Sequence, residues 1–460
     1  MASRAREPLV IIGAGMTGLA AGRASGAPIY EATRSPGGIC SSYYVRPGST
    51  ERLVEPPADG EAYRFELGGG HWIFGGEPDL LAFIERLTPT QRYERRAAVI
   101  VDDPSELIPY PLQNNLHALG PILAGRALAE ITEGARSVDP QQGARAPRTM
   151  RDWLVGSFGP TLANVFFDPF NRRYTDGLFD VVAPQDGYKS PLDLAAVSRG
   201  ARPPASPSAT TSPGYNATFA YPQGGLDHLA RQLADGLDIH YDAEVVSIDA
   251  TRRILRLADG REVRYDHAIS TVPLDRAVTL AGIELDEEAD PYTSLLVLNI
   301  GAVRGERCPD EHWVYEANSV SGFHRVGFYD NVDPSFLPAS SRGGCAGTDR
   351  DDRRPRTSIY VERACQSDNR PKPAQLVRFM DEVVIELQAR RWIGATEVVD
   401  PTWIEVAYTW TRPGSTWADH ALARLSDLGI HQVGRYGRWR FQGIADSIRD
   451  GLAAGMDLRS

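Results

Sequence analysis

Cysteine is scarce in this sequence, and its four copies stand far apart. Cys40, Cys308, Cys345 and Cys365 form no C-x-x-C pair, so neither a structural zinc site nor a disulfide framework is indicated. Cysteines spaced in this way are typical of free thiols in a reducing compartment. We therefore expect a cytoplasmic protein without a metal site.

Long apolar runs and an excess of positive charge are also missing. No stretch approaches the ~20 apolar residues of a membrane-spanning helix, and the first residues, MASRAREPLVIIGAG, do not resemble a secretory signal. Lys and Arg number 49 against 60 Asp and Glu, which gives a net charge of −11. Because nucleic-acid phosphates require clustered basic residues, we expect neither a nucleic acid nor a membrane as partner.

The composition is that of an ordinary globular protein, with 42% hydrophobic and 24% charged residues among 460. This length exceeds one hydrophobic core, so two or three domains are expected. Apolar residues at helical spacing predict helices over 16–25, 77–90, 115–135, 149–166 and 373–390, and a loop followed by a helix over 434–456. Short apolar or alternating runs predict strands over 8–12, 27–31, 240–271, 291–330 and 356–362.

The strongest local signal is the glycine motif Gly13-Ala-Gly15-Met-Thr17-Gly18, which lies between a predicted strand and a predicted helix. Gly13 permits a tight turn, Gly15 lets the backbone approach a pyrophosphate, and Gly18 lets helix and strand pack closely. The N-terminus of the helix then faces the phosphates. Glu31 ends the next strand, near the position expected for an acid that contacts the ribose. The motif predicts a dinucleotide-binding fold, for either NAD or FAD.

Further glycine pairs distinguish FAD from NAD. Gly37-Gly38 follows Glu31, and Gly70-His71 ends the segment ELGGGH. This arrangement resembles flavoproteins of the amine oxidase and protoporphyrinogen oxidase group, in which the paired glycines pass beside the flavin. The resemblance implies that FAD is the cofactor. It extends to a strand position that meets the adenine and to a C-terminal segment that meets the pyrophosphate and the flavin: Val245, Gly434, Arg435 and Ser447.

Several motifs also resemble UDP-galactopyranose mutase, in particular its eukaryotic branch. They are Gly70-His71-Trp-Ile-Phe, Tyr110-Pro-Leu-Gln113-Asn-Asn, Phe166-Phe-Asp-Pro-Phe-Asn171, and Trp313-Val-Tyr315 followed by Arg325. In that family the histidine lies beside the flavin, the tyrosine and glutamine hold the uracil, and the Phe-to-Asn motif lines the uridine pocket. The Trp-x-Tyr motif and the arginine line the sugar and diphosphate site, where a guanidinium can bind two phosphate oxygens at once.

Other positions depart from that family. Its second diphosphate arginine has no counterpart in the segment DGYKSP, where Lys189 offers a point charge instead. Its C-terminal tyrosine and asparagine, which both reach the diphosphate, are replaced by Phe441 and Ala445. The residues at the nucleotide end of the site therefore match those of the family, whereas several at the diphosphate and sugar end differ.

Two enzyme classes follow from these resemblances. The first is a mutase-like isomerase that interconverts pyranose and furanose forms of a nucleotide sugar, with N5 of reduced flavin as the nucleophile. Arg325 and Lys189 would then serve the diphosphate, Tyr315 the sugar and His71 the flavin. The second is an FAD-dependent oxidase or dehydrogenase of a sugar or amino sugar, which the lost diphosphate donors favour. A non-catalytic flavin-binding protein would be expected to lose the pocket aromatics, which are present.

The resemblance implies an α/β architecture: a Rossmann-like FAD-binding domain with an inserted helical domain and an antiparallel β-sheet domain. We expect the FAD-binding domain to comprise residues 1–80, 215–280 and 425–460. A mainly helical domain would span 81–214, and a substrate-binding sheet domain 281–424. The active site would lie where the three meet, a usual place for a ligand cleft. We also expect a small-molecule substrate and a homodimer.

Overall fold

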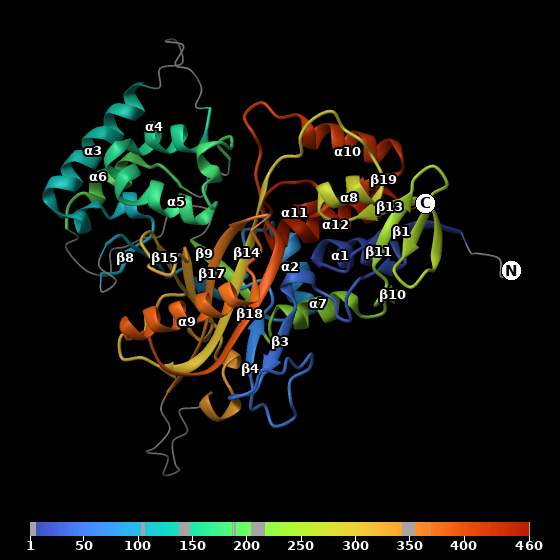
Figure 1. The fold of residues 1–460 in the computed structure, drawn as a ribbon, viewed down its shortest axis with the longest axis horizontal. Coiled ribbons are helices and arrows are strands. Elements are labelled where there is room, and N and C mark those ends of the chain that lie inside the picture. The colour runs from blue at the N-terminus through green and yellow to red at the C-terminus, as the bar shows by residue number, and fades with distance from the viewer. Residues whose placement is uncertain are drawn as a thin grey trace.

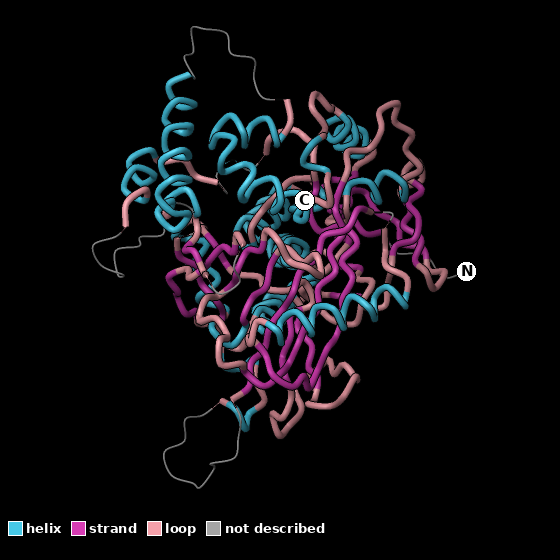
Figure 2. The backbone as a smooth tube through the Cα atoms, turned by 60° about the vertical axis from the view of Figure 1, so that its left-hand side comes forward, coloured by secondary structure: helices cyan, strands magenta, loops and turns pink. Residues whose placement is uncertain are grey.

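The computed structural model describes residues 6–102, 106–137, 148–185, 187, 190–203, 217–342, 355–367 and 369–459. The chain forms two large β-sheets with helices packed around them, and a group of four helices, α3 to α6, lies beyond one end of the second sheet (Figure 1). Figure 2, turned by 60°, shows many of the helices gathered at the upper left and the strands in the middle, right and lower part of the molecule. This is the α/β class expected from the sequence.

The first sheet has the strand order β10–β2–β1–β13–β12–β11, with β19 added beside β13. Parallel pairs join β10 to β2, β2 to β1, β1 to β13 and β13 to β19, whereas β11, β12 and β13 form an antiparallel meander. Because β1 and β2 run in the same direction, the turns that follow them meet at one edge of the sheet. The strands are β1 (Arg6–Ile12), β2 (Ile29–Tyr30), β10 (Ile239–His240), β11 (Val245–Asp249), β12 (Ile254–Leu257), β13 (Glu262–Ser270) and β19 (Ile430–Gln432).

Both faces of the first sheet are covered, as the side chains of β1 show. Successive strand residues point to opposite faces. Leu9 and Ile11 pack into a core with α1 (Met16–Ser25), whereas Val10 and Ile12 pack into a separate core with α8 (Leu274–Leu280) and α10 (Trp417–Asp427). A continuous apolar run in β1 is therefore what this position requires.

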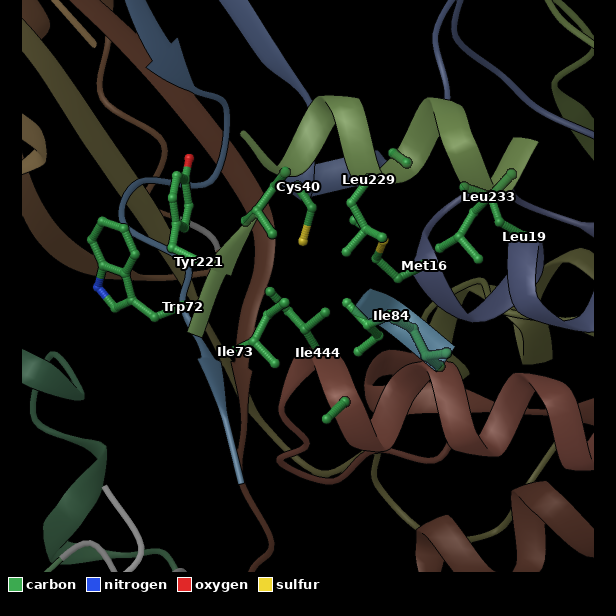
Figure 3. Packing of buried hydrophobic residues seen from close by; sticks show 14 of the residues in the cluster. Met16, Leu19, Cys40, Trp72, Ile73, Ile84, Tyr221, Leu229, Leu233 and Ile444 are labelled. Carbon is green, nitrogen blue, oxygen red and sulfur yellow. The ribbon is translucent and has the colours of Figure 1, made fainter. Parts of the chain in front are cut away.

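Helix α12 (Ile444–Asp457) lies very close to α1. A Cβ atom on Gly451 would lie 2.1 Å from the carbonyl oxygen of Thr17, and one on Gly455 would lie 2.4 Å from that of Ala21. Only glycine allows this approach. Two further helices, α2 (Pro78–Leu87) and α7 (Leu226–Ala234), complete the layer, and their apolar side chains converge with those of α1 and α12 (Figure 3): Leu19, Ile84, Leu229, Leu233 and Ile444.

The second sheet has the order β18–β14–β17–β16–β15–β7–β8. All its pairs are antiparallel except β7 with β15, which is parallel. Helix α9 (Pro373–Ala389) packs Phe379, Val383 and Leu387 against one face. The strands are β7 (Ala97–Ile100), β8 (Ile108–Pro109), β14 (Tyr292–Arg304), β15 (Trp313–Glu316), β16 (Arg325–Phe328), β17 (Arg356–Gln366) and β18 (Ile393–Thr409).

Two small sheets and the helical group complete the fold. One small sheet pairs β3 (Ser42–Val45) with β4 (Tyr63–Glu66), and the other joins β5 (Ile73–Phe74), β9 (Thr218–Pro222) and β6 (Thr90–Glu94). In the helical group, α4 bends at Gly159, which has a φ of +78° and precedes Pro160, and a π-helical turn then leads into α5. The remaining helices are α3 (Gly120–Ser137), α4 (Met150–Leu162), α5 (Asp168–Tyr174), α6 (Leu194–Gly200) and α11 (Gly434–Gly437).

The structure differs from the sequence expectations in two places. Residues 90–109 were expected to belong to a helical region, but they supply β6, β7 and β8, so helices dominate only from about residue 116. The 17-residue strand β18 was not predicted; it forms the edge of the second sheet, where a proline such as Pro401 is tolerated. The division into three domains stays a prediction. Among the described residues, no helix combines the length and apolar character needed to cross a bilayer.

Candidate active site

Two cavities meet where the first sheet, the second sheet and the helical group come together. The first, which we call the glycine cavity, has a volume of about 390 Å³ and is lined largely by turns. The second, the aromatic chamber, has a volume of about 210 Å³ and lies between the helical group and the second sheet. The cavities share seven lining residues: Gly70, Trp72, Phe74, Arg325, Tyr408, Phe441 and Gly443.

The predicted glycine motif forms one wall of the glycine cavity. Gly13 has a φ of +99°, and a Cβ there would lie 2.4 Å from the Thr271 hydroxyl oxygen. A Cβ on Gly18 would lie 1.9 Å from the carbonyl oxygen of Gly13, so Gly18 permits the close packing of α1 against the turn. Gly15, by contrast, lines the cavity, and a Cβ there would point into open space. The side of the turn that faces the protein is thus tightly packed, and the side that faces the cavity is open.

Glu31 braces this turn from the end of β2. Its Oε2 atom accepts the N–H of Ala14 at 2.7 Å, and its Oε1 atom accepts both the N–H and the hydroxyl of Thr33 at 2.8 Å. Each carboxylate oxygen can accept more than one hydrogen bond, and Glu31 also lines the cavity. The carboxylate can therefore hold the turn and bind hydroxyl groups of a ligand at the same time.

Two further segments close the glycine cavity. Gly37 forms a parallel bridge with Gly15 and donates its N–H to the carbonyl of Ala14 at 2.8 Å. Gly434 has a φ of +81°, and a Cβ there would lie 2.5 Å from the Thr17 hydroxyl oxygen. The Arg435 guanidinium, which follows, donates to the carbonyl of Ala407 and lies 4.5 Å from the centre of the Phe441 ring. The cavity therefore presents backbone N–H groups and the guanidinium groups of Arg325 and Arg435 to a ligand.

His71 lies on the turn between β4 and β5 and lines the glycine cavity. Its Nδ1 atom is 3.1 Å from the carbonyl oxygen of Gly69. Because a carbonyl only accepts, Nδ1 carries the proton and Nε2 is the unprotonated nitrogen. Burial lowers the pKa of His71 to about 4, so the imidazole is neutral near pH 7. Its backbone N–H donates to Glu66 Oε2 at 3.3 Å, and burial raises the pKa of Glu66 to about 8.

The aromatic chamber gathers residues from segments far apart in the sequence. Tyr110 lies 5.1 Å, centre to centre, from Tyr315 across it, and Arg95 stacks behind Tyr110 at 4.8 Å. The predicted substrate residues Gln113, Phe166, Asn171, Trp313 and Arg325 also line the chamber. The other aromatic residues that line it are Trp72, Phe74, Trp153, Phe167, Phe170, Tyr174, Tyr408 and Phe441.

The two amide side chains of the chamber are already oriented by the protein. Gln113 Nε2 donates to the carbonyl of Pro191 at 2.7 Å, and Asn171 Nδ2 donates to that of Phe167 at 2.7 Å. Each donor group is an NH₂ with a second hydrogen, and each amide oxygen is an acceptor. Both amides can therefore offer a donor and an acceptor in fixed positions, which suits the recognition of a nucleobase edge.

Arg325 supplies the permanent positive charge among the described residues that line the chamber. It lies opposite Glu362 on the neighbouring strand β17, and its Nε and Nη2 atoms both donate to that carboxylate, Nε at 2.9 Å. Burial alone would raise the pKa of Glu362, but Arg325 outweighs it and lowers this pKa to about 2. His324 lies 3.5 Å from the same carboxylate, and burial lowers its pKa. The guanidinium is thus fixed in place and partly neutralised.

Comparison with known proteins identifies the family. The pattern of the flavin-containing amine oxidoreductases matches residues 27–296, more than half of the chain. The chain belongs to this family. The flavoprotein is also similar in structure to reduced UDP-galactopyranose mutase, with a TM-score of 0.77 at 21% identity over 98% of this chain and 93% of that one.

Two other solved structures share the fold at lower similarity. Putrescine oxidase bound to putrescine has a TM-score of 0.54 at 15% identity, over 98% of this chain and 99% of the oxidase. A fatty acid isomerase from P. acnes has a TM-score of 0.55 at 15% identity, over 97% of each chain. At these identities the similarity is one of fold, which is shared by enzymes of different reactions.

The residues of the flavoprotein's glycine cavity fit FAD, the cofactor of this family. The open space at Gly15 is where a Cβ would meet a pyrophosphate, and helix α1, which begins there, has no side-chain cap and no acid in its first turn. Free N–H groups at a helix start bind anions. Glu31 supplies acceptors for ribose hydroxyls, and His71 and Gly70 lie at the far wall, next to the aromatic chamber.

The structure places most of the predicted site residues on these two cavities. Those on the glycine cavity are Gly13, Gly15, Thr17, Glu31, Gly37, Gly38, Gly70, His71, Gly434, Arg435 and Ser447. Val245 lies elsewhere, opposite Leu257 in the buried core of the first sheet, and its predicted adenine contact stays a prediction. Lys189 lies outside the described residues.

Sequence reasoning missed several residues of the site, including three whose contacts fix its shape. Tyr408, at the end of β18, lines both cavities, and Gln185 lines the chamber while donating to the carbonyl of Thr409 at 2.9 Å. Glu362 pairs with Arg325. None of them lies in a recognisable motif. The pairing of β16 with β17 is what brings Glu362 to Arg325, and no local pattern encodes that register.

Proposed function

We propose that this flavoenzyme acts on a nucleotide sugar and interconverts its pyranose and furanose forms, as a UDP-galactopyranose mutase does. Reduced FAD would supply the nucleophile of that reaction. The glycine cavity would hold the cofactor, and the aromatic chamber would hold the nucleotide, with the sugar at the wall that the two cavities share.

One observation carries this proposal. The motifs that resemble the uridine and sugar site come from four separate segments, at residues 110–113, 166–171, 313–315 and 325, and all four line a single chamber. That chamber shares Gly70 and Arg325 with the cavity built by the cofactor motifs. Such a convergence is expected of a bound ligand that reaches the flavin, and not of residues that merely fill a core.

Each side chain would bind or orient the substrate. Tyr110 offers a ring face to the base, and Gln113 offers a donor and an acceptor to its edge. Arg325 would bind the diphosphate through Nη1, because Glu362 occupies its other two nitrogens. Tyr315 would line the sugar site beside it. Neutral His71 would place an unprotonated Nε2 at the flavin without adding a charge.

A direct assay tests the reaction. Anaerobic holoenzyme, with its FAD reduced by dithionite, is mixed with UDP-hexoses and the products are separated by chromatography. We expect interconversion of pyranose and furanose isomers with reduced flavin and none with oxidised flavin. Absence of any isomer with every UDP-hexose tried, together with bleaching of the oxidised holoenzyme by a sugar or oxygen uptake in air, would contradict the proposal.

Oxidation of a sugar or amino sugar is the second candidate, and a specific feature favours it. The charge of Arg325 is compensated by buried Glu362, and Phe441 and Ala445 stand where the mutase has diphosphate donors. An oxidase does not need to stabilise a departing diphosphate. Under this alternative, oxidised holoenzyme would be bleached by substrate in the absence of oxygen and would consume oxygen in its presence.

We further propose that the protein is a cytoplasmic homodimer. Among the described cysteines, Cys40, Cys308 and Cys365 are all free thiols, which agrees with a reducing compartment. Light scattering of the purified holoenzyme would measure the oligomeric state, and a mass of one chain would contradict the dimer.

A further inference from the structure

The turn 67–71, between β4 and β5, is the partition between the two cavities. Gly68, Gly70 and His71 line the glycine cavity, and Gly70 also lines the aromatic chamber. The shape of this turn therefore decides which groups face the flavin and how the two cavities communicate. The contacts that fix the conformation of this turn therefore affect the flavin site.

The turn packs against the Tyr360 ring on one side and faces the cavities on the other, so packing holds it from one side only. Gly69 has a φ of +78°, and a Cβ on Gly70 would lie 2.3 Å from the Tyr360 ring, so both positions require glycine. Glycine gives the backbone its widest conformational freedom. A turn with three consecutive glycines, Gly68 to Gly70, needs hydrogen bonds to keep a single shape.

Hydrogen bonds hold the two ends of the turn in different ways. At its start, Leu67 N–H donates to the carbonyl of Ser41 at 2.9 Å, and Gly68 N–H donates to that of Ile39 at 3.0 Å. At its end, His71 N–H donates to the Glu66 carboxylate at 3.3 Å. Within the turn, Gly69 N–H donates to the carbonyl of Glu66 at 3.3 Å and His71 Nδ1–H donates to that of Gly69 at 3.1 Å. The start is thus tied to a neighbouring segment by its backbone, whereas the end is tied behind the turn by the Glu66 side chain.

Glu66 is itself held rigidly behind the turn. It is completely buried, and its second oxygen accepts the Tyr221 hydroxyl at 2.5 Å. Arg64 donates to that hydroxyl at 3.1 Å and forms an ion pair with Asp333 at 3.4 Å. Glu66 lines neither cavity. Its two oxygens thus connect a fixed polar network to the backbone of His71.

We propose that Glu66 is a positioning residue, which sets the turn 67–71 and with it the place of the His71 imidazole against the flavin. It acts through the His71 N–H and does not touch cofactor or substrate. The inference rests on flavin binding by this family and on no particular reaction, so it holds for an isomerase and for an oxidase.

Three variants separate the reach of the Glu66 side chain, its terminal group and the support behind it. Glu66→Asp keeps the carboxylate but shortens the side chain by one methylene, so it cannot reach both Tyr221 and His71. Glu66→Gln keeps the length but replaces one acceptor by an NH₂ donor; the Tyr221 hydroxyl can accept from that NH₂, so the amide oxygen can still accept the His71 N–H. Tyr221→Phe removes only the support behind Glu66. Glu382→Gln, at an exposed ion pair on α9, is the matched control.

The readouts are amide exchange at His71 and the midpoint potential of the bound flavin, both measured on holoenzyme of known FAD content. We expect about tenfold faster exchange in Glu66→Asp, because a hydrogen bond of about 1.4 kcal/mol is lost, and a smaller increase in Glu66→Gln, which can keep that bond. We also expect a shift in potential of about 30 mV, a tenfold change in relative affinity for the two redox states of a two-electron couple. The control should match the wild type.

A Glu66→Asp holoenzyme with wild-type exchange and wild-type potential would overturn the proposal, because the reach of the Glu66 side chain would then not matter. Tyr221→Phe covers the case in which the Glu66 variants do not fold. Its His71 exchange should rise about threefold, since Glu66 remains but is less firmly held. Unchanged exchange in Tyr221→Phe would equally contradict the proposal.

Discussion

The glycine cavity and the aromatic chamber are built by opposite means. The cavity is shaped by backbone: Gly13, Gly15 and Gly434 sit where a side chain would either clash or fill the space. The chamber is shaped by side chains, with Tyr110, Tyr315 and other aromatic rings around oriented amides. The cofactor, which is common to the family, is thus bound mainly by backbone groups, which every residue carries. The substrate is bound by side chains, which can differ between members. The two regions should therefore respond differently to mutation.

The largest effect on ligand binding is expected in the glycine cavity. Gly15→Val adds a side chain to an extended residue with no protein atom within 4 Å, so the fold should survive while the pyrophosphate is excluded. Overpacking of this kind costs about 1–3 kcal/mol, so FAD affinity should fall about 10- to 100-fold. Equilibrium dialysis of the visible flavin measures it.

The matched control is Gly125→Ala on the open surface of α3, where a Cβ also meets nothing. It should bind FAD normally and gain up to about 1 kcal/mol of stability from helix propensity. If Gly15→Val retained wild-type FAD affinity, the placement of the pyrophosphate would be wrong.

The largest effect on stability is expected at the Arg325–Glu362 pair. Glu362→Gln removes a buried carboxylate and leaves the partly buried Arg325 guanidinium without its counter-charge, which should lower the free energy of unfolding by about 3–5 kcal/mol. Urea unfolding measures this. Glu397→Gln, at a more exposed pair with Arg356 in the same sheet, should cost less.

The same pair gives a prediction for acid pH. The folded pKa of Glu362, about 2, lies below its ordinary value of 4.5. The unfolded chain therefore binds the proton first, and the stabilisation is complete above pH 4.5 and is lost as the pH falls toward 2. The wild type should lose more stability than Glu362→Gln across this window. Equal losses in the two proteins would contradict the assigned pKa.

A moderate effect is expected at the base-binding end of the chamber. Gln113→Ala removes one oriented amide, and a hydrogen bond is worth about 0.5–1.5 kcal/mol, so UDP should bind up to about tenfold more weakly by calorimetry. Gln388→Ala removes a similar amide-to-carbonyl hydrogen bond on α9, far from the chamber, and should leave binding unchanged. Equal affinity of both variants would mean that the base lies elsewhere.

The smallest effect is expected at His71. Because burial holds its pKa near 4, the imidazole stays neutral above pH 5. The visible spectrum of the bound flavin should therefore show no inflection from His71 between pH 5 and 7. A titration in this range that disappears in His71→Asn would show that the histidine is more exposed to water than the structure indicates.

The glycine cavity could be predicted from the sequence better than the aromatic chamber, because one is built by a local backbone motif and the other by side chains from distant segments. The glycine motif is local, since Gly13 to Gly18 and Glu31 report a turn, a helix start and a strand end within one βαβ unit. The chamber became visible only through a family resemblance, because its residues are brought together by long-range packing. Glu362 was beyond prediction, since it meets Arg325 through the register of β16 with β17.

Strand β18 shows the same limit at the level of the fold. Pro401 lies inside it and is paired with Leu298 of β14, which is compatible with proline because β18 is the edge strand of its sheet. Its place in the sheet is set by the long antiparallel pairing with β14, which no local pattern encodes. Tyr408, which this strand carries into both cavities, was missed for that reason.

The central claim is that the glycine cavity and the aromatic chamber form one site. Titration of oxidised holoenzyme with UDP, followed by the visible absorption of the flavin, tests it most directly. We predict a saturable change in the flavin spectrum that needs a higher UDP concentration in Gln113→Ala. Binding of UDP by calorimetry with no change in the flavin spectrum, or no binding at all, would contradict the account.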